Sequence, residues 1–343
     1  MSRTPRRSLF TAFVALLLLG AGSAVSSAHA EDLAQELKKV PYQIVFESYQ
    51  EQNWDLHLVR ADGSARVNLT RTPDVNELYP HVSADGTKVC FLVDAGEGEK
   101  KTRDVYRMNL DGAGRRLVAR GARDPCWTAD DRGIVYVKSE FEQFTLLDFA
   151  TKGVFVFDLA SGRHREHPNR DLHHLFAISA TPDGKWYAVT VHGGMGYSHG
   201  ILAVEAEGQK VFNLGIPGCR PDVSRDGQRI AWASSDYSLG VGDLDFSGPA
   251  PRVVHVRDII TSDKPWKVQH VDWSPDGRYV AFTRGPYKKG LGLASSPALV
   301  GAQAPKWDIC VGDPNATNRW VAITADGHSN KEPDWVPLAA ERR

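Results

Sequence analysis

The amino-acid sequence predicts an all-β fold: a six-bladed β-propeller of four-stranded antiparallel blades. Three observations predict it. One strand–turn–strand module, best seen in residues 270–282 (HVDWSPDGRYVAF), has four further aligned copies along the 343-residue chain. The turn aspartates of the five copies are separated by 45, 53, 43 and 50 residues, close to the period of about 40 to 50 residues of propeller blades. The two ends of the chain each carry part of one further unit.

The module itself has the residues of a β-hairpin. β-branched and aromatic residues on both sides favour strands, and Pro275, Asp276 and Gly277 between them favour a turn. A third and a fourth strand, joined by a second turn such as Asp111–Gly112, are expected after each copy. Each unit therefore has the four strands of a propeller blade. The other copies lie at residues 82–91, 127–136, 180–189 and 223–232.

The chain ends complement each other. Residues 42–47 match the strand that follows the turn of the module, so the first unit lacks its opening strand. Residues 331–337 (KEPDWVP) match residues 269–275 (QHVDWSP) and supply such a strand. We expect the two segments to pair in one mixed blade, which closes the ring without a free sheet edge. An open array of sheets is the alternative, and it would leave the terminal units unpaired.

The N-terminus predicts export. Arg3, Arg6 and Arg7 precede an apolar run over residues 9–19, and Ala28-His29-Ala30 matches an A-x-A cleavage site. The apolar run is shorter than the roughly 18 to 20 residues that a membrane span needs. We expect a signal peptide (residues 1–30), a short N-terminal segment (31–40), a single propeller domain (41–343) and no membrane span after cleavage. The expected location is the periplasm or the exterior of a bacterium.

Composition and cysteine usage limit the remaining possibilities. The chain has 41 basic and 42 acidic residues, so nucleic acid is not an expected partner, and we expect a monomer. The four cysteines, Cys90, Cys126, Cys219 and Cys310, fall in predicted strands of different units. Their even number in an exported chain permits disulfides, with Cys90 and Cys126 as the candidate pair. Buried free thiols are the favoured interpretation.

Two columns of the repeat alignment supply the candidate site. The innermost strands of a propeller bring equivalent positions close to one axis, where a pocket can form. The first column varies in chemistry and holds Tyr79, Asp124, Ala177, Arg220, His270 and Glu332. The second column holds His81, Cys126, Ser179, Asp222, Asp272 and Asp334. We expect its repeated aspartates to form a hydrogen-bonding device. The predicted ligand-binding residues are Tyr79, His81, Asp124, Arg220, His270 and Glu332.

Three further features carry weaker signals. Four longer segments (139–153, 193–200, 259–268 and 285–306) interrupt the repeat, and function tends to lie on such loops. His164 and His167 form an HxxH pattern that we expect to lie exposed on an outer strand. Gly193 to Gly196 is glycine-rich but opens no helix, so a phosphate-binding loop is not expected.

The WSPDG turn followed by an apolar strand, and the DLDG-like turn before the fourth strand, resemble the TolB-type, WD-repeat-like propeller repeats of bacterial envelope proteins. The resemblance covers almost all of the chain after the signal peptide. It implies a six-bladed propeller and leaves function open, because the module recurs in binding proteins, peptidases and lyases.

A second resemblance concerns metal. Tyr79-Pro80-His81 before the turn is similar to a segment of the oligogalacturonate lyase propellers, where an HPH-type stretch binds a divalent metal. This chain keeps His81 and has Tyr79 in place of the other histidine. A site of three or more imidazoles would need further histidines from elsewhere in the chain. The candidates for these are His173, His174, His192, His199 and His270.

The sequence thus favours an exported recognition or scaffold protein over an enzyme, one that binds an envelope or extracellular protein, peptide or glycan at the propeller mouth, and it leaves the enzyme question open. No cofactor is expected. The alternative is a metal-dependent carbohydrate-active enzyme that uses the same pocket and a divalent metal.

Overall fold

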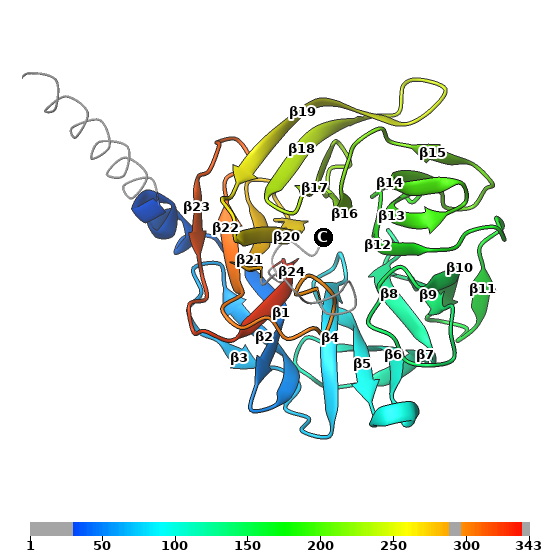
Figure 1. Cartoon of the computed structure of the whole chain (residues 1–343), viewed down its shortest axis with the longest axis horizontal. Helices are drawn as coiled ribbons and strands as arrows, with labels where there is room; N and C mark the ends of the chain where they lie inside the picture. Colours follow the sequence, from blue (N-terminus) through cyan, green and yellow to red (C-terminus); the bar gives the residue numbers. More distant parts are fainter. Residues whose placement is uncertain (1–29, 288–295, 338–343) are drawn as a thin grey trace, which may run out of the picture.

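The computed structural model of the protein describes residues 30–287 and 296–337. These residues form six four-stranded antiparallel sheets arranged as blades around one axis (Figure 1). The predicted six-bladed β-propeller is confirmed. The predicted signal peptide, residues 1–30, lies outside the described residues except for Ala30.

Each blade begins at the axis and ends at the rim. Blade 1 contains β24 (Ser329–Val336), β1 (Gln43–Gln50), β2 (Asn53–Arg60) and β3 (Val67–Asn68). Blade 2 contains β4 (Val75–Val82), β5 (Lys88–Ala95), β6 (Thr102–Asn109) and β7 (Arg116–Ala119). Blade 3 contains β8 (Ala122–Trp127), β9 (Gly133–Ser139), β10 (Thr151–Asp158) and β11 (His164–Glu166).

The other three blades follow the same order. Blade 4 contains β12 (Leu175–Ala180), β13 (Trp186–Gly194), β14 (Tyr197–Glu205) and β15 (Val211–Asn213). Blade 5 contains β16 (Cys219–Val223), β17 (Arg229–Ser235), β18 (Ser238–Asp245) and β19 (Arg252–Thr261). Blade 6 contains β20 (Trp266–Trp273), β21 (Val280–Pro286), β22 (Asp308–Gly312) and β23 (Trp320–Ala322).

The ring closes as the sequence predicted. The C-terminal strand β24 pairs antiparallel with β1, with Trp335 opposite Ile44. Every residue of β24 is buried, so the strand that completes blade 1 is also part of the core. Residues 30–37 form a helix, and its Leu33 and Leu37 are buried in the cluster that contains Trp335.

The repeated turn has a common hydrogen-bond pattern. Ser274 Oγ donates to Asp276 Oδ1 at 2.7 Å, and the backbone N–H of Tyr279 donates to Ser274 Oγ at 2.9 Å. Gly277 has φ +64°, a conformation that glycine adopts without steric cost. A serine or threonine makes the same bonds at the head of the turns of blades 2 to 5, at Ser83, Thr128, Thr181 and Ser224. This pattern explains why the module recurs with its S/T-x-D sequence.

Tryptophans at the ends of the inner strands fill the space between blades. Trp127, Trp273 and Trp335 are 7%, 5% and 4% exposed. Trp273 packs among Ala231 and Val241 of blade 5 and Phe282 of its own blade. Burying an indole removes about 150 to 250 Å² from water, worth roughly 4 to 6 kcal/mol per residue. Each of them belongs to a different hydrophobic cluster that contains residues of neighbouring blades.

All four cysteines are free thiols, as favoured from the sequence. Cys90, Cys126 and Cys310 are buried, and Cys219 is half-buried.

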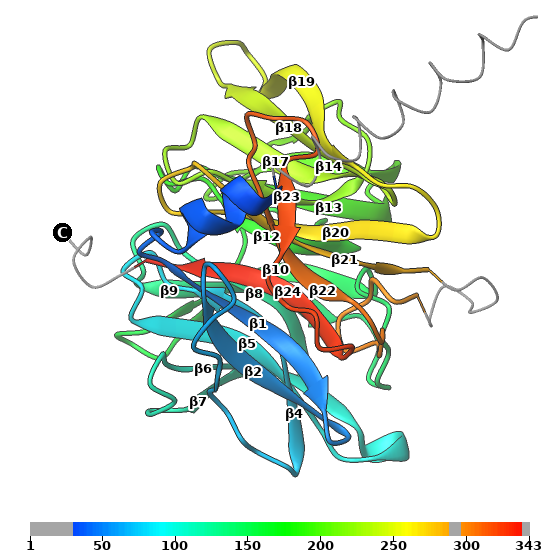
Figure 2. The same cartoon turned by 90° about the vertical axis from the view of Figure 1, so that its left-hand side faces the viewer.

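The two ends of the ring differ in their connections. At one end, here called the turn end, the Ser/Thr-x-Asp turns of blades 2 to 6 join the inner strand to the next strand of the same blade. Because neighbouring strands are antiparallel, the β9–β10, β13–β14 and β21–β22 connections lie at the other end, here called the loop end. The four longer segments of the sequence all lie at the loop end, and residues 288–295 of the last one fall outside the described residues. Figure 2 shows the ring from the side.

Candidate functional site

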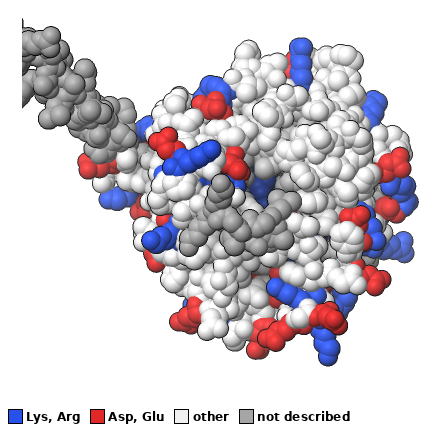
Figure 3. Space-filling model, viewed as in Figure 1, with Lys and Arg blue, Asp and Glu red and all other residues white. Residues whose placement is uncertain are grey.

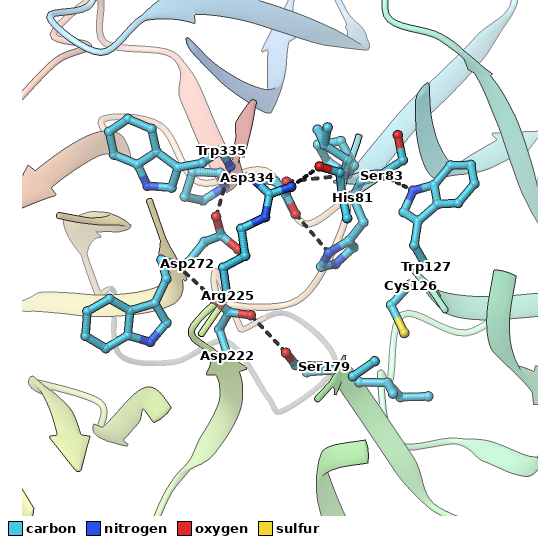
Figure 4. Close-up of a pocket in the computed structure, with 18 of the residues that line it drawn as sticks. His81, Ser83, Cys126, Trp127, Ser179, Asp222, Arg225, Asp272, Asp334 and Trp335 are labelled. Atoms are coloured by element: carbon cyan, nitrogen blue, oxygen red, sulfur yellow. Dashed lines mark hydrogen bonds and ion pairs between the residues drawn. The ribbon is translucent and has the colours of Figure 1, made fainter. Parts of the chain in front are cut away.

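An open pocket lies on the propeller axis at the turn end. It has a volume of about 240 Å³, and residues of the inner strands of all six blades line it. Figure 4 shows polar side chains from different blades pointing towards this space. The pocket therefore lies where the alignment columns predicted that equivalent positions converge.

The first column shares a backbone conformation that the sequence did not reveal. Its six residues all have positive φ, although none is glycine: Tyr79 52°, Asp124 46°, Ala177 51°, Arg220 56°, His270 55° and Glu332 51°. The strand register shifts at this point in every blade, so each residue forms a β-bulge. Such a conformation costs about 1 kcal/mol or more per residue. The backbone conformation at this position is therefore common to all six blades, whereas the side chain differs from blade to blade.

Five of the six predicted ligand-binding residues line the pocket: Tyr79, His81, Arg220, His270 and Glu332. Asp124 does not line it. Its carboxylate instead accepts a hydrogen bond from the backbone N–H of Ala177 at 3.0 Å. This bond holds the bulge of the next blade.

The aspartates of the second column join neighbouring blades. Asp222 accepts the backbone N–H of Trp273 at 2.8 Å, and Asp272 accepts that of Trp335 at 2.9 Å. Asp334 accepts the backbone N–H of Val82 at 3.2 Å. The hydrogen-bonding device predicted from the repeated aspartate is confirmed.

These carboxylates also give the pocket an unusual protonation state. Burial, with a smaller contribution from the charge of Asp334, raises the pKa of Asp222 to about 6, against two hydrogen bonds that lower it. Burial, followed by the charges of Asp334 and Asp222, raises the pKa of Asp272 well above its ordinary value. Burial and mutual repulsion therefore favour the protonated form of both carboxyl groups.

Two basic groups face the carboxylates at the mouth. His81 Nδ1 lies 3.0 Å from Asp334 Oδ2. The exposed side chain of Arg225 extends from blade 5 across the mouth and donates to the carbonyl of Ala84 in blade 2 (Figure 4). Arg225 thus links blades 5 and 2 across the mouth of the pocket.

The floor of the pocket is an ion-pair network. Arg220 Nη1 lies 3.1 Å from Glu332 Oε1, and Arg220 Nη2 contacts the carboxylate of Asp148. Burial raises the pKa of Glu332 to about 8, although Arg220 opposes this shift. His270 lies 3.1 Å from the same Glu332 oxygen through Nε2.

His270 has a defined tautomer. Its Nε2 lies 2.9 Å from the carbonyl oxygen of Ala298, which can only accept, so Nε2 carries the hydrogen. Its Nδ1 then accepts from Thr283 Oγ1 at 2.6 Å. Burial, with the charges of Arg220 and Lys331, lowers the pKa of His270 well below its ordinary value. The ring is neutral and both of its nitrogens are engaged.

The same network continues to the loop end, where backbone carbonyls accept its hydrogen bonds. Lys331 Nζ donates to the carbonyls of Leu299 at 2.6 Å and Pro297 at 3.3 Å, and Arg103 Nη2 donates to Val300 at 3.3 Å. Together with Ala298, which also accepts from Arg220, four consecutive carbonyls satisfy buried donors. We call residues 297–300 the cap. Figure 3 shows the loop-end face, where charges of both signs are scattered around the margin.

The histidines do not converge at the pocket. His173, His174, His192 and His199 contact one another or Phe149 in pairs at blade 4, while His81 and His270 belong to the pocket. Across residues 30–287 and 296–337, no group of three or more His, Cys, Asp or Glu side chains is placed to hold a metal. The donor set at the pocket thus gives no support to the lyase-like metal site, since His81 faces Asp334 and His270 is engaged at both nitrogens.

Two patterns need correction. His164 is exposed, but His167 is buried at 1% exposure, and its Nε2 lies 2.8 Å from the carbonyl of Glu205. Residues three apart on a strand face opposite sides, so exposure of both was a wrong expectation.

Residues 196–200 (GYSHG) match the GxSxG pattern, which the sequence reasoning missed. They belong to the β13–β14 hairpin, whereas a nucleophile elbow joins a strand to a helix.

Six blades around an axial pocket define the class: a β-propeller with a central pocket. Among solved structures, the chain is similar to TolB from Acinetobacter baumannii, with a TM-score of 0.61 and 17% identity over 87% of this chain and 67% of that chain. It is also similar to a chain of a nidogen/laminin complex, with a TM-score of 0.57 and 10% identity over 87% of this chain and 99% of that chain. The fold is therefore that of a TolB-like six-bladed propeller.

An oligogalacturonate lyase in complex with manganese has a TM-score of only 0.46 and 15% identity, over 69% of each chain. This similarity is too low to support a shared activity or metal. No protein-family model matches the sequence, and no curated protein matches it.

None of the helical residues in the described ranges forms a segment long and apolar enough to cross a membrane.

Proposed function

We propose that the protein is an exported recognition module that binds an envelope or extracellular protein, peptide or glycan in the axial pocket at the turn end. The observation that carries this proposal is the difference between the two ends of the propeller axis. At the turn end the pocket is open and lined by all six blades, whereas at the loop end the cap carbonyls already satisfy Arg103, Arg220, His270 and Lys331.

The lining suits a protruding segment of a partner. Tryptophan and proline side chains, such as Trp127, Pro182 and Pro275, surround the polar residues. A pocket of about 240 Å³ has room for one or two side chains or sugar units, and a few fixed polar groups give such a site its specificity. His81, Asp222 and Asp334 are the groups that would orient the ligand.

The test begins with a ligand search. A random peptide library is panned on the immobilised protein, and a glycan array is probed with the labelled protein. The dissociation constant of each selected ligand is then measured for the wild type, His81→Ala and Arg165→Ala. Arg165 is an exposed residue of blade 3 that pairs with Glu207, so its variant is the matched control.

The proposal predicts that His81→Ala weakens binding by about tenfold or more, which corresponds to about 1.4 kcal/mol, and that Arg165→Ala leaves it unchanged. Equal binding by all three proteins would place the ligand elsewhere. If the wild type cleaves an acidic polysaccharide in a manganese-dependent manner and His81→Ala does not, the protein is instead the metal-dependent carbohydrate-active enzyme.

A further inference from the structure

The glycine-rich segment after β13 brings two histidines together at the loop end. Gly193, Met195 and Gly196 have φ +70°, +53° and +84°, so the chain reverses tightly between β13 and β14. The reversal makes His192 and His199 direct cross-strand partners. Side chains of such a pair lie on the same face of the sheet, with their Cβ atoms about 5 Å apart.

The imidazole rings of His192 and His199 approach each other through their Nδ1 atoms. Their Nδ1 atoms are 3.0 Å apart, and the ring planes are inclined by 74°. Between two neutral imidazoles only one of these nitrogens can carry a hydrogen, and the other presents its lone pair. Phe149 packs against His192 with ring centroids 4.5 Å apart, which holds that ring in place. His192 is half-buried, and His199 is exposed.

This arrangement fits two ligands of one metal ion. Imidazole nitrogens bind zinc or copper at about 2.0 to 2.1 Å. Two nitrogens 3.0 Å apart then subtend an angle of about 90 to 95° at the metal, which is the angle between neighbouring ligands in the tetragonal geometry that Cu²⁺ prefers.

We propose that His192 and His199 form a two-histidine clamp for a divalent transition-metal ion, with Cu²⁺ preferred. The metal takes the place of the hydrogen between the two Nδ1 atoms, and that hydrogen moves to Nε2 of the same ring, so both histidines remain neutral. Since no group of three ligands exists among residues 30–287 and 296–337, water completes the coordination. The clamp lies at the loop end, away from the axial pocket, and is independent of ligand binding there.

The neighbouring groups leave the clamp available. His174 Nε2 lies 3.2 Å from Glu140 Oε2, and its Nδ1 lies 3.0 Å from the carbonyl of Gly193, so this histidine is already engaged.

The experiment is a calorimetric titration of the full chain with Cu²⁺ at pH 7 in a non-chelating buffer. The variants are His192→Ala and His199→Ala. The control is His255→Ala, because His255 is also exposed but faces a carboxylate, Asp243, at 2.7 Å. The proposal predicts one copper ion per chain with nitrogen hyperfine coupling in the EPR spectrum. Each clamp variant is expected to weaken binding by about tenfold or more, and the control leaves it unchanged. Copper binding as tight as in the wild type in either clamp variant overturns the proposal.

A second measurement needs no variant and guards against misfolding of the mutants. The wild type is treated with diethyl pyrocarbonate, with and without one equivalent of Cu²⁺, and the modified histidines are identified by mass spectrometry. The clamp predicts that copper protects His192 and His199 and leaves His255 reactive. Equal modification with and without copper contradicts it.

Discussion

The two ends of the propeller axis are built from the same six inner strands, yet they use their polar groups differently. At the turn end, His81, Asp222 and Asp334 line an open pocket. At the loop end, Lys331 and Arg103 donate to the carbonyls of the cap. The polar groups of the loop end are enclosed by the chain. Those of the turn end also bond to one another and to backbone N–H groups, but they border an open cavity that a ligand can enter. Four substitutions test this difference, from the largest expected effect to the smallest.

Lys331→Ala should be the most damaging change at the loop end. Lys331 is fully buried and lies 3.4 Å from Glu47 Oε1. Its removal leaves the buried carboxylate of Glu47 without its counter-ion, and breaking a buried pair costs about 3 to 5 kcal/mol. Chemical denaturation measures the loss in the free energy of unfolding. Arg165→Ala, which breaks an exposed pair, should change it by no more than about 1 kcal/mol, and a similar loss in both variants would refute the structural role of the cap.

Asp272→Ala tests the contact between blades at the turn end. It leaves the backbone N–H of Trp335 without the acceptor that lies 2.9 Å away. An unsatisfied buried N–H costs about 1 to 3 kcal/mol, and denaturation should show a loss of that size. Asp272→Asn keeps an acceptor oxygen and should recover most of it. If the two variants are equally stable, the hydrogen bond is not what matters at this position.

Asp222→Asn tests the protonation state of the pocket. Because the pKa of Asp222 rises from 3.8 to about 6 on folding, the folded chain binds this proton more tightly than the unfolded chain. That contribution to stability is complete below pH 3.8 and is lost as the pH rises through about 6. The variant lacks this loss, so its melting temperature relative to the wild type should rise across the same range, by the equivalent of about 1 kcal/mol or more. A difference that is independent of pH would show that Asp222 has an ordinary pKa.

Arg225→Ala should have the smallest effect on stability. The side chain is exposed, and surface substitutions usually change stability by no more than about 0.5 kcal/mol. The same change removes the side chain that crosses the mouth, so the affinity for a pocket ligand should change while the denaturation curve does not. A large loss of stability would make Arg225 a structural tie between blades 2 and 5.

The fold was predictable because the turn carries its signature in side chains. Ser274, Asp276 and Gly277 each have a specific task in the turn, so the same residue types return in each blade. The ring closure was predictable for the same reason, because Trp335 and its neighbours repeat the residue types of the module. The repeated aspartates were also interpreted correctly, since each accepts a backbone N–H.

The site was less predictable, for two physical reasons. Tyr79, Arg220 and His270 share a bulged backbone conformation although they are different residue types. Their sequence positions therefore give no sign of the structure that they have in common. The cap contributes carbonyl oxygens, and these carry no side-chain signal in the sequence. The hairpin that pairs His192 with His199 was likewise not apparent, because register decides the pairing.

The most direct test of which end of the propeller axis binds the ligand places one thiol label at the turn end and one at the loop end. The native thiols are buried except Cys219, which is half-buried, so Arg225→Cys at the pocket mouth and Gln143→Cys, at an exposed position of the loop end, can be labelled selectively with a bulky maleimide. Binding of the ligand selected by panning or array is then measured for both labelled proteins. The account predicts that the label at position 225 blocks binding and the label at position 143 does not. Blocking by the label at position 143 alone would contradict it.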